Sequence, residues 1–126
     1  MPDLKMNILI VDDFSTMRRI IKNILRQLGY NNILEAEDGS TALAKMKQQK
    51  FDLVITDWNM PNMSGMELLK AIREDEDMKQ TPVLMVTAEA MKDNIISAVK
   101  AGVNNYILKP FTVETMKEKI EKVFLN

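Results

Sequence analysis

Five polar residues directly follow four short apolar runs of the sequence. Asp12 and Asp13 follow residues 8–11, Asp57 follows residues 53–56, Thr87 follows residues 83–86, and Lys109 follows residues 106–108. Short runs rich in Val and Ile, separated by helical patterns, are typical of buried parallel strands. Because parallel strands share their carboxyl edge, we expect three carboxylates, a hydroxyl and an ammonium to converge where open α/β sheets bind ligands.

This set of side chains suits phosphoryl transfer with a divalent cation. Clustered carboxylates raise one another's pKa unless a cation lies between them, and oxygen ligands favour Mg²⁺ where phosphate is handled. A carboxylate such as Asp57 can attack phosphorus to give an aspartyl-phosphate. Lys109 could neutralise a phosphoryl oxygen as a point charge, and Thr87 could donate a hydrogen bond to another.

Each of these residues also has an ordinary interpretation when taken alone. Strand-end aspartates cap helices or begin turns, Thr87 could be a simple strand-end hydroxyl, and Lys109 with Pro110 could form a turn. Core packing is the better interpretation for Trp58 and Tyr106 taken singly. The common edge of the sheet is what favours a functional site.

Composition narrows the class of protein. The 126 residues suit one domain, predicted over residues 1–126, and 46% of them are hydrophobic. A net charge of −1, from 17 basic and 18 acidic residues, gives no electrostatic case for nucleic acid or membrane binding. The chain has no cysteine and no histidine, which excludes disulfides, thiolate or imidazole metal ligands, and phosphohistidine. Neither a signal-peptide pattern nor a membrane-length apolar run occurs, so we expect a cytoplasmic protein.

Strand and helix patterns alternate along the chain. The strands are expected at residues 6–11, 32–37, 51–57, 82–87 and 105–108, and helices at 15–28, 40–49, 65–75 and 92–101, with a last helix after Thr112. Ser15 and Thr112 are predicted N-caps, and Gly29 and Gly102 are predicted helix stops. Five strand–helix pairs predict a three-layer, doubly wound α/β sandwich around a five-stranded parallel sheet.

The whole chain resembles the receiver domains of two-component response regulators. Four segments carry the resemblance: residues 11–19 (VDDFSTMRR), 57–63 (DWNMPNM), 83–90 (VLMVTAEA) and 109–112 (KPFT). The segments DWNMP and TAEA indicate the chemotaxis branch of that family. One departure is Ser64, where those proteins often have Asp before the glycine, and it lies outside the acidic residues.

The resemblance implies a flavodoxin-like fold with strand order 2-1-3-4-5 and a specific set of roles. Asp57 would accept the phosphoryl group, and Thr87 and Lys109 would contact it. Mg²⁺ would be held by Asp13, Asp57 and the main-chain carbonyl of Asn59, with Asp12 acting through water. Further implied features are a switch pair (Thr87 and Tyr106), residues that tune dephosphorylation (Asn59 and Glu89) and a cis Lys109–Pro110 bond.

The resemblance also implies partners. A chemotaxis histidine kinase would donate the phosphoryl group, and a flagellar motor switch protein would bind the phosphorylated form of this monomer. The implied partner face is made by residues around the fourth helix, fifth strand and fifth helix: Ala90, Lys92, Ile95, Val99, Tyr106, Phe111, Lys119 and Lys122. A separate phosphatase is a further partner left open.

Alternative functions remain at this point. The chain could be a phosphorelay intermediate, or a receiver that only drains phosphoryl groups from a shared kinase. A true Mg²⁺-dependent phosphatase with an aspartyl nucleophile is disfavoured, because such enzymes commonly place an acid two residues after the nucleophile, where this chain has Asn59. We therefore expect no enzyme activity beyond the protein's own phosphorylation and dephosphorylation.

Overall fold

The computed structural model describes residues 3–88 and 92–125; for residues 92–94 it describes the backbone alone. Strands and helices alternate along this chain, as the sequence predicts. Their bounds are β1 (Ile8–Val11), α1 (Ser15–Gln27), β2 (Ile33–Ala36), α2 (Gly39–Gln48), β3 (Leu53–Asp57), α3 (Gly65–Glu74), β4 (Val83–Thr87), α4 (Lys92–Lys100), β5 (Asn105–Leu108) and α5 (Val113–Val123).

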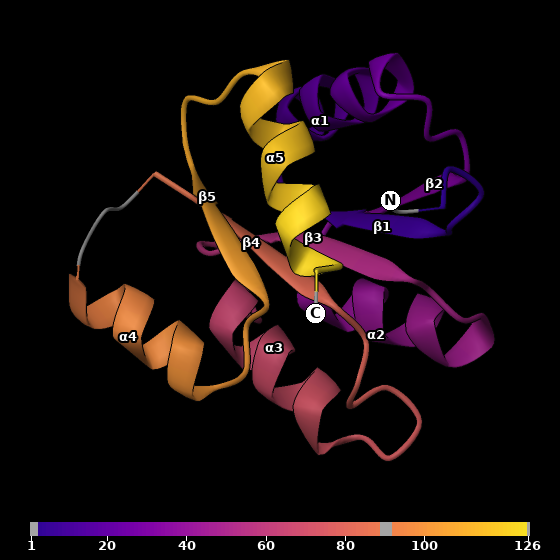
Figure 1. Cartoon of the computed structure of the whole chain (residues 1–126). Coiled ribbons are helices and arrows are strands. Elements are labelled where there is room, and N and C mark those ends of the chain that lie inside the picture. Colours follow the sequence, from indigo (N-terminus) through magenta and orange to yellow (C-terminus); the bar gives the residue numbers. More distant parts are fainter. Residues whose placement is uncertain (1–2, 89–91, 126) are drawn as a thin grey trace.

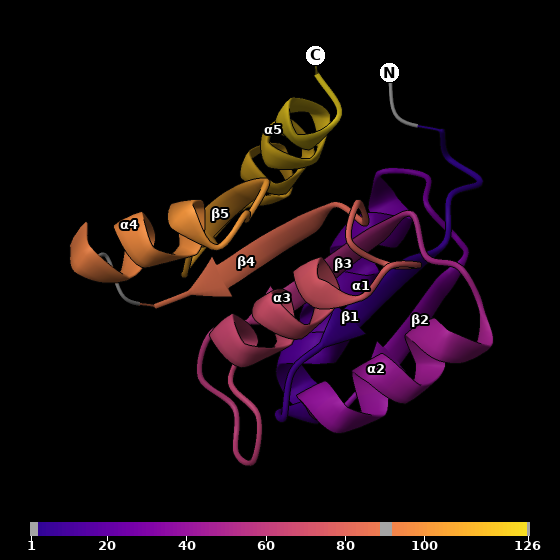
Figure 2. The ribbon, with the colours of Figure 1, turned by 90° about the horizontal axis from the view of Figure 1, so that it is seen from below.

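The five strands form one parallel sheet in the order β2-β1-β3-β4-β5, which confirms the expected topology. Helices α1 and α5 cover one face of the sheet, and α2, α3 and α4 lie on the other (Figures 1 and 2). The result is the three-layer sandwich that the alternating pattern predicts. No helix in the described ranges is long and apolar enough to cross a membrane.

Two apolar cores lie on the two faces of the sheet. Because successive strand residues point to opposite faces, Ile8 and Ile10 of β1 pack into the core beneath α1 and α5. Leu9 and Val11 pack into the core beneath α2 and α3. All four are fully buried, so β1 reads in the sequence as a continuous apolar run rather than an alternating one.

The register of the sheet brings the strand ends together. Val11 lies opposite Thr56, so the residues after β1 stand beside the end of β3. Asp57 lies opposite Val86 on β4, and Thr87 lies opposite Leu108 on β5. The carboxyl edge formed by β1, β3, β4 and β5 therefore carries the five polar residues that the sequence singles out.

Local hydrogen bonds explain where three helices begin. Asp38 caps α2 by accepting the Thr41 N–H at 2.7 Å. Ser64 and Glu67 form a reciprocal capping box at α3. Thr112 caps α5, as predicted, by accepting the Thr115 N–H at 3.1 Å.

The start of α1 differs from the prediction. Ser15 was expected to be the N-cap, which is wrong: Ser15 is the first helical residue, and Phe14 is the N-cap and has no capping side chain. Ile20 of this helix, although apolar, is 45% exposed. The helix is rotated so that Ile21, Ile24 and Leu25 fill the core.

Candidate functional site: an acidic cluster at the carboxyl edge of the sheet

Three carboxylates converge at the end of the sheet, as the sequence predicts. Asp12 and Asp13 follow β1, and Asp57 ends β3. One carboxylate oxygen from each of the three lies within 4.8 Å of the other two. Asp12 is only 1% exposed and Asp57 only 7% exposed, while Asp13 is half-buried. This much buried negative charge is costly unless a cation joins it.

The cost is visible at Asp12. Burial is the main cause that raises the pKa of Asp12 to about 6, and the charges of Asp57 and Asp13 raise it as well. A hydrogen bond from the Phe14 N–H and the charge of Lys109 act in the opposite direction. The folded protein therefore favours the protonated form of Asp12 more than water does, and a further positive charge would counteract this shift.

Lys109 enters the cluster from β5. Its Nζ lies 3.1 Å from Oδ1 of Asp57, and its backbone N–H donates to the Thr87 carbonyl at 2.8 Å. Thr87 is 4% exposed at the end of β4. The Lys109–Pro110 bond is cis, as expected. The three carboxylates and the Lys109 ammonium thus share one site, and Thr87 lies at the same edge of the sheet.

The donor set fits a hard divalent cation. Oδ2 of Asp12 and Oδ1 of Asp13 are buried and have no hydrogen-bond partner among the described residues. Buried polar oxygens normally have a partner, and oxygens of this kind are the preferred ligands of Mg²⁺. Asn59, whose main-chain carbonyl is expected to be a further ligand, is exposed in the loop that follows β3.

Gly65 is a residue whose importance the sequence did not reveal. A Cβ atom built on Gly65 would overlap the carbonyl oxygen of Asp57, and the Gly65 N–H donates to the Trp58 carbonyl at 2.8 Å. The first turn of α3 can therefore lie directly against the end of β3. A glycine immediately after the cap residue Ser64 was the only sequence signal of this close approach.

The expected partner face is described in part. Ala90 lies outside the described residues, as does the side chain of Lys92. Glu89, which is expected to tune dephosphorylation, also lies outside them. Ile95 is half-buried, and Val99 is 60% exposed on α4. These two described side chains make α4 the apolar part of the expected face.

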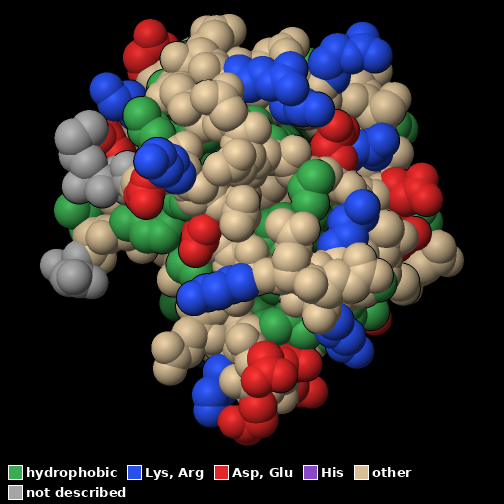
Figure 3. Space-filling view, turned by 90° about the vertical axis from the view of Figure 1, so that its right-hand side faces the viewer, with side chains coloured by type: hydrophobic (Ala, Val, Ile, Leu, Met, Phe, Trp, Pro, Cys, Tyr) green, Lys and Arg blue, Asp and Glu red, His purple; other side chains and the backbone are tan. Residues whose placement is uncertain are grey.

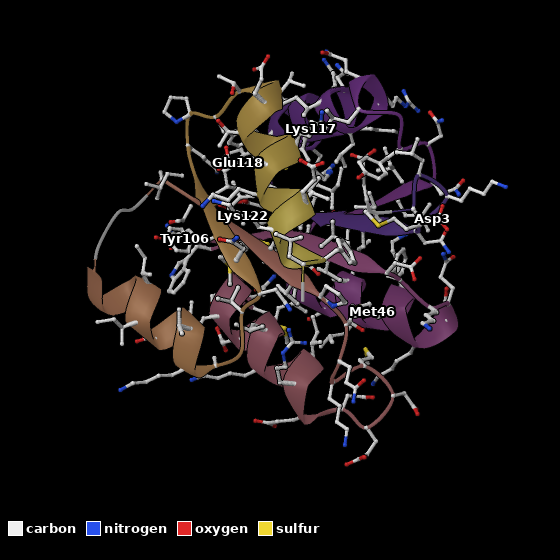
Figure 4. All side chains as sticks on the ribbon, in the orientation of Figure 1. Asp3, Met46, Tyr106, Lys117, Glu118 and Lys122 are labelled. Atoms are coloured by element: carbon white, nitrogen blue, oxygen red, sulfur yellow. The ribbon has the colours of Figure 1, made fainter. Side chains whose placement is uncertain are left out.

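Tyr106, on β5, lies between α4 and α5 on this face. Its side chain is half-buried and packs against the core beneath α2 and α3. The Nζ of Lys119 lies 5.1 Å from the centroid of the Tyr106 ring. Lys122 pairs with Glu118 at 3.0 Å on the neighbouring helix α5 (Figure 4). Tyr106 therefore lies between apolar side chains and the cations of α5.

Phe111 lies in a different environment. It packs against the core beneath α1 and α5 and, with Met17 and Ile20, lines a hollow of about 550 Å³ beside Lys109. Elsewhere on the surface, basic and acidic side chains are interspersed over the face shown in Figure 3. That distribution agrees with the near-zero net charge of the sequence.

The fold and site define a class of signalling protein. The family model of the response regulator receiver domain matches residues 8–121, and the chain belongs to this family. More particularly, the chain closely resembles the chemotaxis protein CheY. It is 64% identical to the chemotaxis protein CheY-3 of Vibrio cholerae over 119 residues, covering 94% of this chain and 92% of that protein. It is 63% identical to the chemotaxis protein CheY of Pseudomonas aeruginosa over 119 residues, covering 94% and 96%.

Solved structures agree with this assignment. The structure of the Vibrio cholerae chemotaxis protein CheY4 matches with a TM-score of 0.89 at 35% identity, covering 95% of this chain and 99% of that chain. A putative response regulator from Chloroflexus aurantiacus matches with a TM-score of 0.89 at 30% identity, covering 94% and 97%. The chain is thus a CheY-like chemotaxis receiver domain, a signalling protein rather than an ordinary enzyme.

Proposed function

We propose that this chain, as one receiver domain over residues 1–126, is a phosphorylation-operated binding switch of bacterial chemotaxis. The observation that carries the proposal is the pair of Asp57 and Lys109, 3.1 Å apart. They lie in a cluster where two buried carboxylate oxygens have no hydrogen-bond partner among the residues that the structure describes. Such a cluster combines a nucleophile, a fixed cation and free metal ligands. Stability alone would not require that combination, because apolar residues fill such positions at less cost.

In the proposed reaction, a carboxylate oxygen of Asp57 attacks the phosphorus of a phosphohistidine on the kinase. The new O–P bond forms as the P–N bond breaks, and the bonding electron pair leaves with the imidazole nitrogen. Lys109 then pairs with a phosphoryl oxygen in place of its contact with Asp57. The Thr87 hydroxyl donates to a second phosphoryl oxygen.

Asp13, Asp57 and the main-chain carbonyl of Asn59 would hold Mg²⁺, and Asp12 would hold it through water. When bound, Mg²⁺ neutralises charge on the phosphoryl oxygens and on the acids around them. The buried oxygens of Asp12 and Asp13 that lack hydrogen-bond partners within residues 3–88 and 92–125 support this ligand set. In the same proposal, Asn59 and Glu89 set the lifetime of the phosphoryl group by controlling the approach of water.

The switch would run from Thr87 to Tyr106. Movement of the Thr87 hydroxyl towards the phosphoryl group frees space behind it, and the Tyr106 ring turns inward. Such a change only shifts the populations of two ring positions. The half-buried ring and the nearby Lys119 ammonium support this role, because a small displacement alters both apolar and cationic parts of the surface.

The partner would be a flagellar motor switch protein, bound in the cytoplasm by the face defined above. That face consists of Ala90, Lys92, Ile95, Val99, Tyr106, Phe111, Lys119 and Lys122. Exposed Val99 would supply an apolar anchor and the lysines would steer an acidic segment. A chemotaxis histidine kinase would supply the phosphoryl group to a monomer.

Phosphorylation is tested with a small donor. Purified protein is incubated with acetyl phosphate and Mg²⁺, and its intact mass is measured. Wild type and Asp52→Asn should gain one phosphoryl group, whereas Asp57→Asn should not. Asp52 is a matched control because it lies just before β3, at the end of the strand away from Asp57. There its carboxylate accepts a hydrogen bond from the Asn7 N–H. Wild-type stoichiometry on Asp57→Asn would contradict the proposal.

A further inference from the structure

Arg18 makes contacts that its place in the sequence did not predict. Its Nη1 donates to the main-chain carbonyl of Asp12 at 2.6 Å, and its Nε donates to Oε1 of Glu35 at 3.0 Å. The side chain is only 16% exposed. Arg18 thus joins α1 to the end of β1 and, through Glu35, to β2.

The contact from Arg18 adds to two other hydrogen bonds that hold Asp12, in the segment that carries both Asp12 and Asp13. The Asp12 N–H donates to the Ala36 carbonyl at 3.1 Å, and Oδ1 of Asp12 accepts the Phe14 N–H at 2.9 Å. With the contact from Arg18, three different polar groups of Asp12 are held by hydrogen bonds. Asp13 projects from the same short segment, so its direction depends on the same anchors.

The chemistry of the guanidinium suits this task. Its planar fork donates two hydrogen bonds in fixed directions, whereas a lysine ammonium is a point charge on a flexible stem. The side-chain charges that set the pKa of Asp12 are those of Asp57, Lys109 and Asp13. Arg18 contacts Asp12 through its main-chain carbonyl, so it acts on the backbone of the loop.

Lys22 provides a natural comparison on the same helix. Its Nζ pairs with Oε2 of Glu35 at 3.4 Å, and its side chain is 27% exposed. Both cations share the Glu35 carboxylate, but the described contact with the Asp12 carbonyl comes from Arg18. Comparing variants of Arg18 and Lys22 therefore distinguishes the effect of pairing with Glu35 from the effect of holding the Asp12 backbone.

We propose, building on the proposed Mg²⁺ site, that Arg18 is a positioning residue that holds residues 12–14 in the arrangement that binds the cation. Substituting a residue that hydrogen-bonds to the ligands of a metal site typically lowers metal affinity by about 10–100-fold. A simple charge effect would have the opposite sign. Removing a nearby positive charge would strengthen Mg²⁺ binding, whereas loss of positioning weakens it.

The test is a Mg²⁺ titration followed by the fluorescence of Trp58, with urea unfolding measured separately in chelator. Trp58 is the single tryptophan, next to Asp57. Arg18→Ala should weaken Mg²⁺ binding about 10-fold or more. Arg18→Lys, which keeps the charge and tests the case in which Arg18→Ala fails to fold, should also bind more weakly than wild type. Lys22→Ala should bind Mg²⁺ like wild type.

Three outcomes would overturn the inference. They are tighter or unchanged binding by Arg18→Ala, restoration of wild-type affinity by Arg18→Lys, and equal weakening by Lys22→Ala. If wild type itself fails to bind Mg²⁺, the proposed function fails first and the inference falls with it. Binding by wild type together with any of the three outcomes rejects only the role of Arg18.

Discussion

Asp12→Asn should stabilise the protein in the absence of divalent cations. The substitution removes a buried charge from a side chain that is 1% exposed. The amide oxygen can still accept the Phe14 N–H, which Oδ1 of Asp12 accepts at 2.9 Å in the structure. The new amide nitrogen faces a cluster in which Asp13 offers an oxygen that has no hydrogen-bond partner in the described part of the chain. The change therefore removes electrostatic cost and keeps the local hydrogen bond.

The size of the effect follows from the pKa of Asp12. Its value of about 6 in the folded protein, against an ordinary value of 3.8 for an Asp carboxyl, means that the folded state binds the proton more tightly. Wild-type stability is therefore highest below the unfolded pKa and is lost as the pH rises through the folded one. At about 1.4 kcal/mol per unit, the wild type loses up to about 3 kcal/mol by neutral pH. Asp12→Asn has no carboxyl group to ionise at this position, so its free energy of unfolding does not fall in this way.

The assay is urea unfolding in chelator from pH 5 to pH 8. The stability advantage of Asp12→Asn should grow by about 1 kcal/mol or more across this range. Asp77→Asn, at an exposed position away from the cluster, serves as a control and should show no such growth. Added Mg²⁺ should stabilise wild type far more than Asp12→Asn, because ligand binding favours the folded state.

A constant difference between Asp12→Asn and wild type from pH 5 to pH 8 would refute the electrostatic reasoning. So would a variant that is less stable than wild type at pH 8 in chelator. Either result would mean that the cluster is relaxed without a cation, and the inference of a metal site from buried, unpartnered oxygens would lose its support.

Two further substitutions probe the geometry of the site. Lys109→Arg should still permit phosphorylation of Asp57 but should reduce the gain in partner affinity, because a guanidinium cannot replace a compact ammonium 3.1 Å from the carboxylate; wild-type partner binding by the phosphorylated variant would contradict this. Gly65→Ala should lower the free energy of unfolding by about 1–3 kcal/mol, since the added Cβ overlaps the Asp57 carbonyl. Unchanged urea unfolding of Gly65→Ala would show that α3 can move away from β3.

The fold was largely predictable because its three central strands, β1, β3 and β4, are buried on both faces. Continuous apolar runs such as residues 8–11 and 83–86 leave little choice but central parallel strands. Strand ends then place Asp57 and Thr87 at one edge without knowledge of the exact register. The strand order came from the family resemblance, since apolar patterns alone do not fix which strands are neighbours.

The contact of Arg18 with Glu35 and the close approach of Gly65 to Asp57 escaped prediction because both depend on packing between separate elements. Arg18 looks like a surface cation on an amphipathic helix, and its role depends on how α1 is rotated over β1. The same rotation leaves the apolar side chain of Ile20 45% exposed. Gly65 looks like a residue after a helix cap, and only the packing of α3 against β3 explains why a side chain is excluded there.

The most direct test of the switch is the affinity for a flagellar motor switch protein with and without a phosphoryl analogue. Fluorescence or calorimetric titration would compare wild type, Asp57→Asn and Val99→Asp in Mg²⁺, before and after addition of beryllium fluoride. The analogue should raise the affinity of wild type, leave that of Asp57→Asn unchanged, and give Val99→Asp little binding in either state. Equal affinity of wild type with and without the analogue would contradict the claim that the acidic cluster controls the α4–β5–α5 face.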